Sequence, residues 1–206
     1  VELQIVKAME GLSDGDLLLI DQVIENDNRV NLLEIELDEA CNQVIAKRQP
    51  TAVDLRMIST VQKTITDLER IGDEAKKIAK TAKQIHTAVS PFMPQIRLSH
   101  IADAVVDMLR TSLDAYARLD TISAAQVVRQ DKEVDAEFKG IMRQLITYMM
   151  EDPRTISQAI ELMFVAKSVE RIGDHAKNIA EYVVYMVKGR DVRHTSLEEI
   201  EREAMR

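Results

Sequence analysis

The chain has 206 residues, of which 46% are hydrophobic and only 3% aromatic, and its formal net charge at pH 7 is −8. This negative charge argues against a nucleic-acid-binding protein, which needs a basic surface, and the few aromatic side chains leave little for bases to stack on. A single cysteine excludes a disulfide framework and a cysteine-based zinc site. No apolar run approaches the roughly 18–20 residues of a membrane-spanning helix, so we expect a cytoplasmic protein with an aliphatic core.

Helical periodicity covers most of the chain. In the first half, the apolar spacing and the positions of Gly and Pro predict three helices, over residues 1–12, 16–47 and 51–85. No capping residue precedes Val1, so we expect the first helix to lack its start. After a proline-containing stretch at 86–94, the pattern predicts three more helices, over 95–119, 121–150 and 152–188. The charged tail that follows has room for one short helix at 197–205.

The spacing of apolar residues predicts the architecture. In the third and sixth helices these residues alternate by three and four positions, which is the seam of a left-handed helical bundle. Gly72 and Gly173 lie on these seams in mid-helix, where Gly costs roughly 1 kcal/mol relative to Ala, so we expect a neighbouring helix to approach closely there. The expected fold is all-α, with two tandem three-helix bundles related by internal duplication. Its predicted parts are a first bundle at 1–88, a linker at 89–94, a second bundle at 95–190 and a charged tail at 191–206.

One stretch occurs twice. The eleven residues from Glu69 to Ala79 return as Glu170 to Ala180, identical at nine positions and 101 residues further along the chain. Such a match identifies an internal duplication. Each copy contains Glu-x-x-x-Asp, which places two carboxylates on one helix face with Cβ atoms about 5–6 Å apart. Two carboxylates held in this way repel each other unless a cation or a basic side chain lies between them.

The helix before each copy carries a matching polar pair, Asp27 with Asn31 and Asp131 with Asp135. If the two helices of each half are antiparallel neighbours, each groove between them gathers three or four carboxylates. Oxygen ligands without His or Cys suit Mg, Ca, Mn or Fe(III) better than zinc or copper. The candidate metal ligands are Asp27, Asn31, Glu69, Asp73, Asp131, Asp135, Glu170 and Asp174. On the second helix this acidic stripe lies roughly 100° from an apolar stripe of Val30, Leu33, Leu37 and Val44.

Other interpretations of these acids stay open. They are also compatible with ordinary solvated helix flanks neutralised by Arg70 or Lys76, in a plain helical scaffold, or with a metal-dependent enzyme. No catalytic motif is present, because a ferritin-like di-iron site needs Glu-x-x-His on its helices and no Gly-rich phosphate loop occurs. His175 replaces Glu74 of the first copy and lies outside the shared pattern, so we expect it to be a solvated surface residue.

Four stretches together resemble the PhoU family. They are the duplicated E-R-I-G-D, the run N-D-N-R-V-N-L-L-E-I-E-L-D-E-A-C at 26–41, A-K-R-Q-P at 46–50 and R-Q-L-I-T-Y-M-M-E-D at 143–152. The resemblance covers essentially the whole chain and implies a tandem pair of three-helix bundles, usually a homodimer.

The resemblance also implies a function. Members of the family are cytoplasmic regulatory adaptors without enzymatic activity, associated with the membrane through their partners. They couple the ATPase subunit of the ABC phosphate transporter to the phosphate-sensing histidine kinase, and they repress the phosphate regulon when phosphate is plentiful. Some members bind multinuclear iron or other metal clusters through E(D)-x-x-x-D motifs, which map here onto the eight candidate ligands. Asn31 departs from the strict carboxylate pattern.

Overall fold

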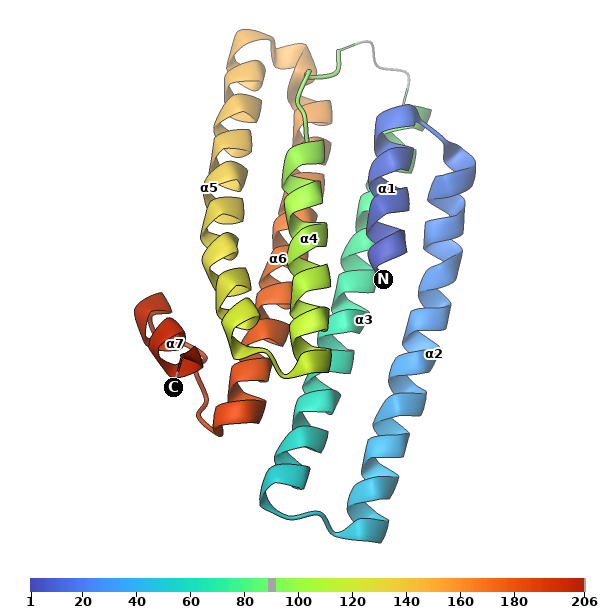
Figure 1. Ribbon diagram of the computed structural model, residues 1–206. Coiled ribbons are helices and arrows are strands. Elements are labelled where there is room, and N and C mark those ends of the chain that lie inside the picture. Colours follow the sequence, from blue (N-terminus) through green and yellow to red (C-terminus); the bar gives the residue numbers. More distant parts are fainter. Residues whose placement is uncertain (89–91, 206) are drawn as a thin grey trace.

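The computed structural model describes residues 1–88 and 92–205, and within these ranges the regular structure is entirely helical (Figure 1). The elements in chain order are α1 (Glu2–Asp14), α2 (Leu17–Arg48), α3 (Ala52–Thr87), α4 (Ser99–Arg118), α5 (Thr121–Glu151), the 3-10 turn η1 (Pro153–Thr155), α6 (Ile156–Lys188) and α7 (Leu197–Ala204). Helices α1–α3 form one bundle and α4–α6 a second, and the two lie side by side with α3 against α6 (Figure 1). The prediction of an all-α fold with two tandem three-helix bundles is confirmed.

The core is aliphatic, as the composition predicted. Ile71 and Ile78 of α3 and their counterparts Ile172 and Ile179 of α6 are fully buried. Because α3 and α6 touch each other as well as the other helices of their own bundles, they are the central pair of the molecule. The repeated stretch therefore lies at its centre.

Equivalent caps begin and end the helices of the two halves. The side chain of Asp16 accepts hydrogen bonds from two backbone N–H groups at the start of α2, and Asp120 does the same at the start of α5. Gly15 ends α1 and Leu119 ends its counterpart α4, both in the left-handed conformation, with φ of 71° and 57°. The duplication thus extends to the helix boundaries.

The fourth helix begins at Ser99 and not, as predicted, at residue 95. Residues 92–98 run in a non-helical conformation along the second bundle, where the hydroxyl of Tyr148 donates to the backbone carbonyl of Gln95 at 3.1 Å. The Arg154 guanidinium also lies 4.1 Å from the centre of the Phe92 ring. These tertiary contacts hold the segment away from helical geometry. Of the predicted linker, residues 89–91 lie outside the described residues, and the domain boundaries stay a prediction.

The two mid-helix glycines are less constrained than expected. A Cβ atom added at Gly72 would lie 3.4 Å from Cγ1 of Val30, and one at Gly173 would lie 3.4 Å from Cγ2 of Val105. These are ordinary van der Waals distances to side chains of neighbouring helices. Close approach therefore does not by itself require glycine at either position.

The predicted apolar stripe of α2 is largely uncovered. The side chains of Leu33, Leu37 and Val44 are 48%, 45% and 43% exposed. The α2–α3 hairpin extends well beyond α1 in Figure 1, so the third helix of the bundle does not cover its far end. We call this uncovered surface the hairpin apolar face; it comprises Leu33, Leu37 and Val44, which share one side of α2.

Candidate functional site

The first acidic groove lies between α2 and α3. Burial of the Glu69 side chain raises its pKa, and the negative charge of Asp73, one turn along α3, raises it further. Two acids of α2, Glu34 and Asp27, act on Glu69 in the same direction across the groove. The structure therefore brings together four carboxylates, three of them predicted as ligands.

The second acidic groove lies between α5 and α6. Burial raises the pKa of Asp174, and the neighbouring charges of Glu170 and Asp131 raise it further. In this groove Lys167 also pairs with Glu170. Asp135 is half-buried on α5, and within the described residues no hydrogen bond or ion pair joins it to the other three acids. Three of the four predicted residues of the second half thus come together.

A lysine of the repeated stretch reaches into each groove. Lys76 Nζ lies 2.5 Å from Oδ2 of Asp27, and Lys177 Nζ lies 2.7 Å from Oδ2 of Asp131. The two lysines occupy the same place in the two copies, seven residues after the glutamate and three after the aspartate. This spacing puts all three charged side chains on one helix face. The repeat itself therefore supplies one counter-charge to each groove, and in the second groove Lys167 adds another.

The first groove contains unsatisfied oxygens. Asp27 is fully buried, yet its Oδ1 has no hydrogen-bond partner in the part of the chain that the structure describes. The buried Oδ1 of Asn31, one turn further along α2, has none there either. Leaving a buried acceptor unsatisfied costs roughly 1–3 kcal/mol, and more for a charged group. Two predicted ligands thus retain the capacity to bind a cation.

The oxygen atoms in the grooves are of the kind that bind a hard cation. In this structure, however, a lysine ammonium group occupies one carboxylate of each groove. Carboxylate and amide oxygens are the ligands that Mg²⁺, Mn²⁺ and Fe³⁺ prefer. However, across residues 1–88 and 92–205 no three Asp, Glu, His or Cys side chains converge closely enough to hold an ion. The acids lie near enough to influence one another's pKa, but Lys76 and Lys177 stand at the carboxylates where an ion would bind.

Sequence reasoning missed Glu181. This α6 side chain is buried, and its burial raises its pKa to about 7, with Lys177 lowering and Asp131 raising that value. It follows Lys177 by one helical turn and so borders the second groove. Its counterpart in the first half is Lys80, so the duplication carried no signal for it. The sequence feature that could have revealed Glu181 is an acidic residue within the apolar run at 179–186.

The prediction for His175 was wrong, because this residue is buried between the two bundles. Its Nδ1 lies 2.7 Å from Oδ1 of Asp67 on α3, and Asn178 donates to the same oxygen at 3.3 Å. Nearby, the buried Glu74 accepts from Arg171 of α6 at 2.9 Å. The face of α6 that carries His175 meets the other bundle and not solvent.

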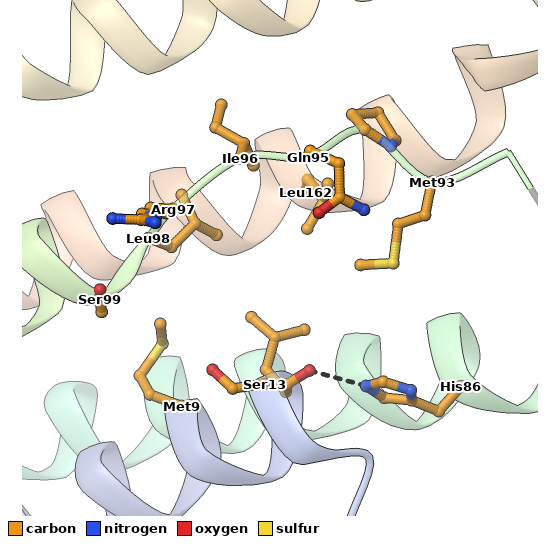
Figure 2. Close-up of a pocket in the computed structure, with 12 residues that line it drawn as sticks. Met9, Ser13, His86, Met93, Gln95, Ile96, Arg97, Leu98, Ser99 and Leu162 are labelled. Atoms are coloured by element: carbon orange, nitrogen blue, oxygen red, sulfur yellow. Dashed lines mark hydrogen bonds between the residues drawn. The ribbon is translucent and has the colours of Figure 1, made fainter.

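A separate cavity of about 330 Å³ lies beside the 92–98 segment. Figure 2 shows side chains of that segment facing Met9 and Ser13 of α1 and His86 of α3, whose Nε2 lies 2.7 Å from the carbonyl oxygen of Leu12. All the polar side chains that line the cavity are exposed. It therefore gathers no buried acid or base of the kind that marks an active site.

None of the described helices combines the length and the apolar character needed to cross a membrane.

Comparison with known proteins identifies the family. The family model described as "PhoU domain" matches residues 1–82 and 98–183, which are the two halves of the duplication. The phosphate-specific transport system accessory protein PhoU homolog of Pseudomonas aeruginosa is 45% identical over 203 residues, covering 98% of this chain and 84% of that protein. The corresponding PhoU of Escherichia coli is likewise 45% identical over 203 residues, covering 98% of this chain and 83% of that protein.

Solved structures agree. The crystal structure of PhoU from Pseudomonas aeruginosa superposes with a TM-score of 0.88 at 45% identity, covering 92% of this chain and 90% of that chain. The phosphate transport system regulatory protein PhoU from Streptococcus pneumoniae gives a TM-score of 0.84 at 24% identity, covering 92% of this chain and 88% of that chain, which supports the fold alone. With the family model matching both halves and relatives similar over nearly the whole chain, the protein belongs to the PhoU family.

Proposed function

We propose that this protein is an accessory protein of phosphate-specific transport that acts as a regulatory adaptor and not as an enzyme. It couples the ATPase subunit of the ABC phosphate transporter to the phosphate-sensing histidine kinase and represses the phosphate regulon when phosphate is plentiful. The observation that carries the proposal is 45% identity, over 98% of the chain, to proteins named as phosphate-specific transport system accessory proteins. The adaptor works in the cytoplasm, reaches the membrane through its partners and binds no nucleic acid.

Deleting the gene tests this proposal. We expect phosphate-scavenging genes to stay expressed in phosphate-rich medium, and a plasmid copy of the wild-type gene to restore repression. Affinity capture of the tagged protein from cells grown in ample phosphate should recover the kinase and the transporter ATPase. Normal repression in the deletion strain contradicts the adaptor role, whatever the fold.

We also propose that the protein is a homodimer. The hairpin apolar face offers three exposed apolar side chains on one side of α2, and a second copy of the chain would bury them. Sedimentation equilibrium at micromolar concentration should give twice the 23.3 kDa of one chain. The double variant Leu33→Glu with Leu37→Glu should shift the mass towards one chain, while Met150→Glu at the other end of the molecule should not. A wild-type mass of one chain at every loading contradicts the proposal.

Finally, we propose that the two acidic grooves bind Mn²⁺, Mg²⁺ or iron. Support comes from the repelling acids in both halves and from the unsatisfied Oδ1 atoms of Asp27 and Asn31. Because an ion that binds only the folded state stabilises it, MnCl2 should raise the melting temperature of the wild type.

The double variant Asp73→Asn with Asp174→Asn is expected to abolish this metal response. It should also melt slightly higher than the wild type without metal, because it removes one repelling charge from each groove. The exposed pair Glu36→Gln with Asp103→Asn, outside the grooves, is the matched control and should respond as the wild type does. A full metal-induced shift in the double variant of the grooves means that the repeated acids are not ligands.

A further inference from the structure

The two acidic grooves share a feature beyond their acids, namely a lysine that each groove holds by one carboxylate. Lys76 of α3 contacts Asp27 of α2, and Lys177 of α6 contacts Asp131 of α5, at 2.5 and 2.7 Å. The same contact recurs in two halves whose sequences have otherwise diverged widely. Both halves therefore kept this contact together with the acids of their grooves.

We infer that Lys76 and Lys177 are tethered counter-ions that compete with a metal cation for Asp27 and Asp131. In the metal-free protein each lysine closes its groove, and cation binding requires the lysine to withdraw. This inference rests on the metal binding proposed above. It adds that the two lysines control whether an ion can enter the grooves.

The geometry prevents the lysine ammonium group and a metal ion from binding the same carboxylate at the same time. A Mg²⁺ ion bound to a carboxylate lies about 2.0–2.1 Å from the oxygen, which is the space that the ammonium group of Lys76 already occupies at Oδ2 of Asp27. Binding at Oδ1 of the same carboxylate would leave two positive charges a few ångströms apart in a partly buried groove, where they repel strongly. A metal ion therefore gains its full interaction with the groove only when the lysine has left.

The lysine is the partner that is free to move. The side chains of Lys76 and Lys177 are 25% and 32% exposed, whereas those of Asp27 and Asp131 are 0% and 6% exposed. A lysine side chain has a flexible four-carbon stem and an ammonium group that water solvates well, so it can turn outward without a change in the backbone. The aspartates are held inside the bundle and stay in place.

The same two helices provide a matched comparison. Lys83 of α3 pairs with Asp21 of α2 at 2.6 Å, two turns from Lys76. Both side chains of this pair are nearly half exposed, at 45% and 46%, and neither belongs to an acidic groove. Lys83 therefore has the same chemistry as Lys76 but no cation with which to compete.

Titration calorimetry with Mn²⁺ on the metal-free protein tests the inference. Replacing Lys76 and Lys177 by Met removes the competing charge, and we expect about tenfold tighter Mn²⁺ binding at each groove. The double Lys→Arg variant keeps the charge and should bind about as weakly as the wild type. Lys83→Met should leave the affinity unchanged. Circular dichroism of each variant without metal checks that it is folded.

A second measurement uses the wild type and so avoids variants that fold poorly. Acetylation of lysines by a water-soluble reagent, read by peptide mass spectrometry, reports how free each ammonium group is. We expect saturating Mn²⁺ to raise the acetylation rates of Lys76 and Lys177 several-fold and to leave that of Lys83 unchanged.

The outcomes separate this inference from the proposal beneath it. If the wild type binds Mn²⁺ but the Met variant binds it no more tightly, or if bound Mn²⁺ leaves the two acetylation rates unchanged, the lysines do not compete and metal binding itself stands. If neither the wild type nor the folded Met variant binds Mn²⁺, metal binding at the grooves fails and the inference falls with it.

Discussion

The two copies of the repeated stretch are alike where each faces its own bundle and different where they face each other. Both copies direct a glutamate, an aspartate and a lysine to the groove with the preceding helix. The two positions at which they differ are Glu74 against His175 and Lys77 against Asn178. Three of these four side chains make contacts across the α3–α6 interface or beside it, His175 and Asn178 with Asp67, and Glu74 with Arg171.

The difference shows why a duplicated domain keeps one part of a motif and changes another. Each half has its own groove, so the same residues serve in both. The interface between the halves occurs only once, and two identical acidic faces would repel there. Diversification made the two faces complementary, with acids on α3 (Asp67 and Glu74) opposite His175 and Asn178 on α6. Arg171, which is the same in both copies, pairs with Glu74 across the interface.

Breaking the buried contact between the bundles should have the largest effect. His175→Leu takes one partner from the buried carboxylate of Asp67 and leaves it the amide of Asn178 and the hydroxyl of Tyr182. Removing one partner of a buried pair costs about 3 kcal/mol or more. Urea unfolding followed by circular dichroism measures this loss. His100→Leu, which replaces an exposed histidine that also contacts a carboxylate, should change stability by less than about 0.5 kcal/mol. Equal losses of stability in the two variants would mean that the buried pair between the bundles stabilises the protein no more than an exposed pair does.

Glu181 distinguishes the halves by their response to pH, because the first half has Lys80 at this place. Burial raises the pKa of Glu181 from 4.5 to about 7 in the folded state, so the folded protein binds more protons than the unfolded chain between these values. The stability that this group contributes is therefore fully present below pH 4.5 and is lost as pH rises towards 7. The loss in the free energy of unfolding is on the order of 2 kcal/mol.

Glu181→Gln should remove that loss, so that the variant gains stability over the wild type as pH rises from 5 to 7.5. Urea unfolding across this range, in the presence of a chelator, measures the difference. Lys80→Gln is the control at the equivalent position and should follow the wild-type profile. Parallel curves for the wild type and Glu181→Gln would show that the carboxyl group is ionised throughout.

Exchanging the residues that make the grooves unequal should have a smaller effect. Asn31→Asp gives the first groove the acid that the second has at Asp135. Without metal, the added like charge should destabilise the protein by about 1 kcal/mol, and with Mn²⁺ the first groove should bind nearly as tightly as the second. Asp135→Asn should do the reverse in the second groove. Melting curves with and without Mn²⁺ measure both changes, and unchanged curves in both variants would rule out these positions as ligands.

The smallest effect concerns a glycine in α5 that has no counterpart in α2. The first half has Glu36 at the position equivalent to Gly140, and a Cβ atom added at Gly140 meets nothing within 4 Å among the described atoms. Gly140→Ala should therefore stabilise the protein by up to about 1 kcal/mol, because alanine has the higher helix propensity. Chemical denaturation measures this gain. A loss of stability would indicate that this part of α5 needs the flexibility of glycine.

The sequence by itself determined the all-helical class, the duplication, the family and most residues of the acidic grooves. These features depend on periodicity and on spacing along one helix, and an α-helix converts spacing into direction without reference to its neighbours. Asp27, Glu69 and Asp73 were predicted to lie together because their positions follow from the angular geometry of two adjacent helices. That prediction needed only the antiparallel pairing of α2 with α3.

Only the tertiary structure decided which neighbour each helix face would meet. His175 lies about 100° round α6 from Asp174, a direction that the sequence does specify. The periodicity of α6 does not show that the first bundle covers this face. For the same reason the sequence did not reveal that residues 92–98 stay non-helical against Tyr148 and Arg154, or that Glu181 is buried. Burial, and with it the pKa of a side chain, is a property of the surfaces that pack together, and those are set by contacts between residues far apart in the chain.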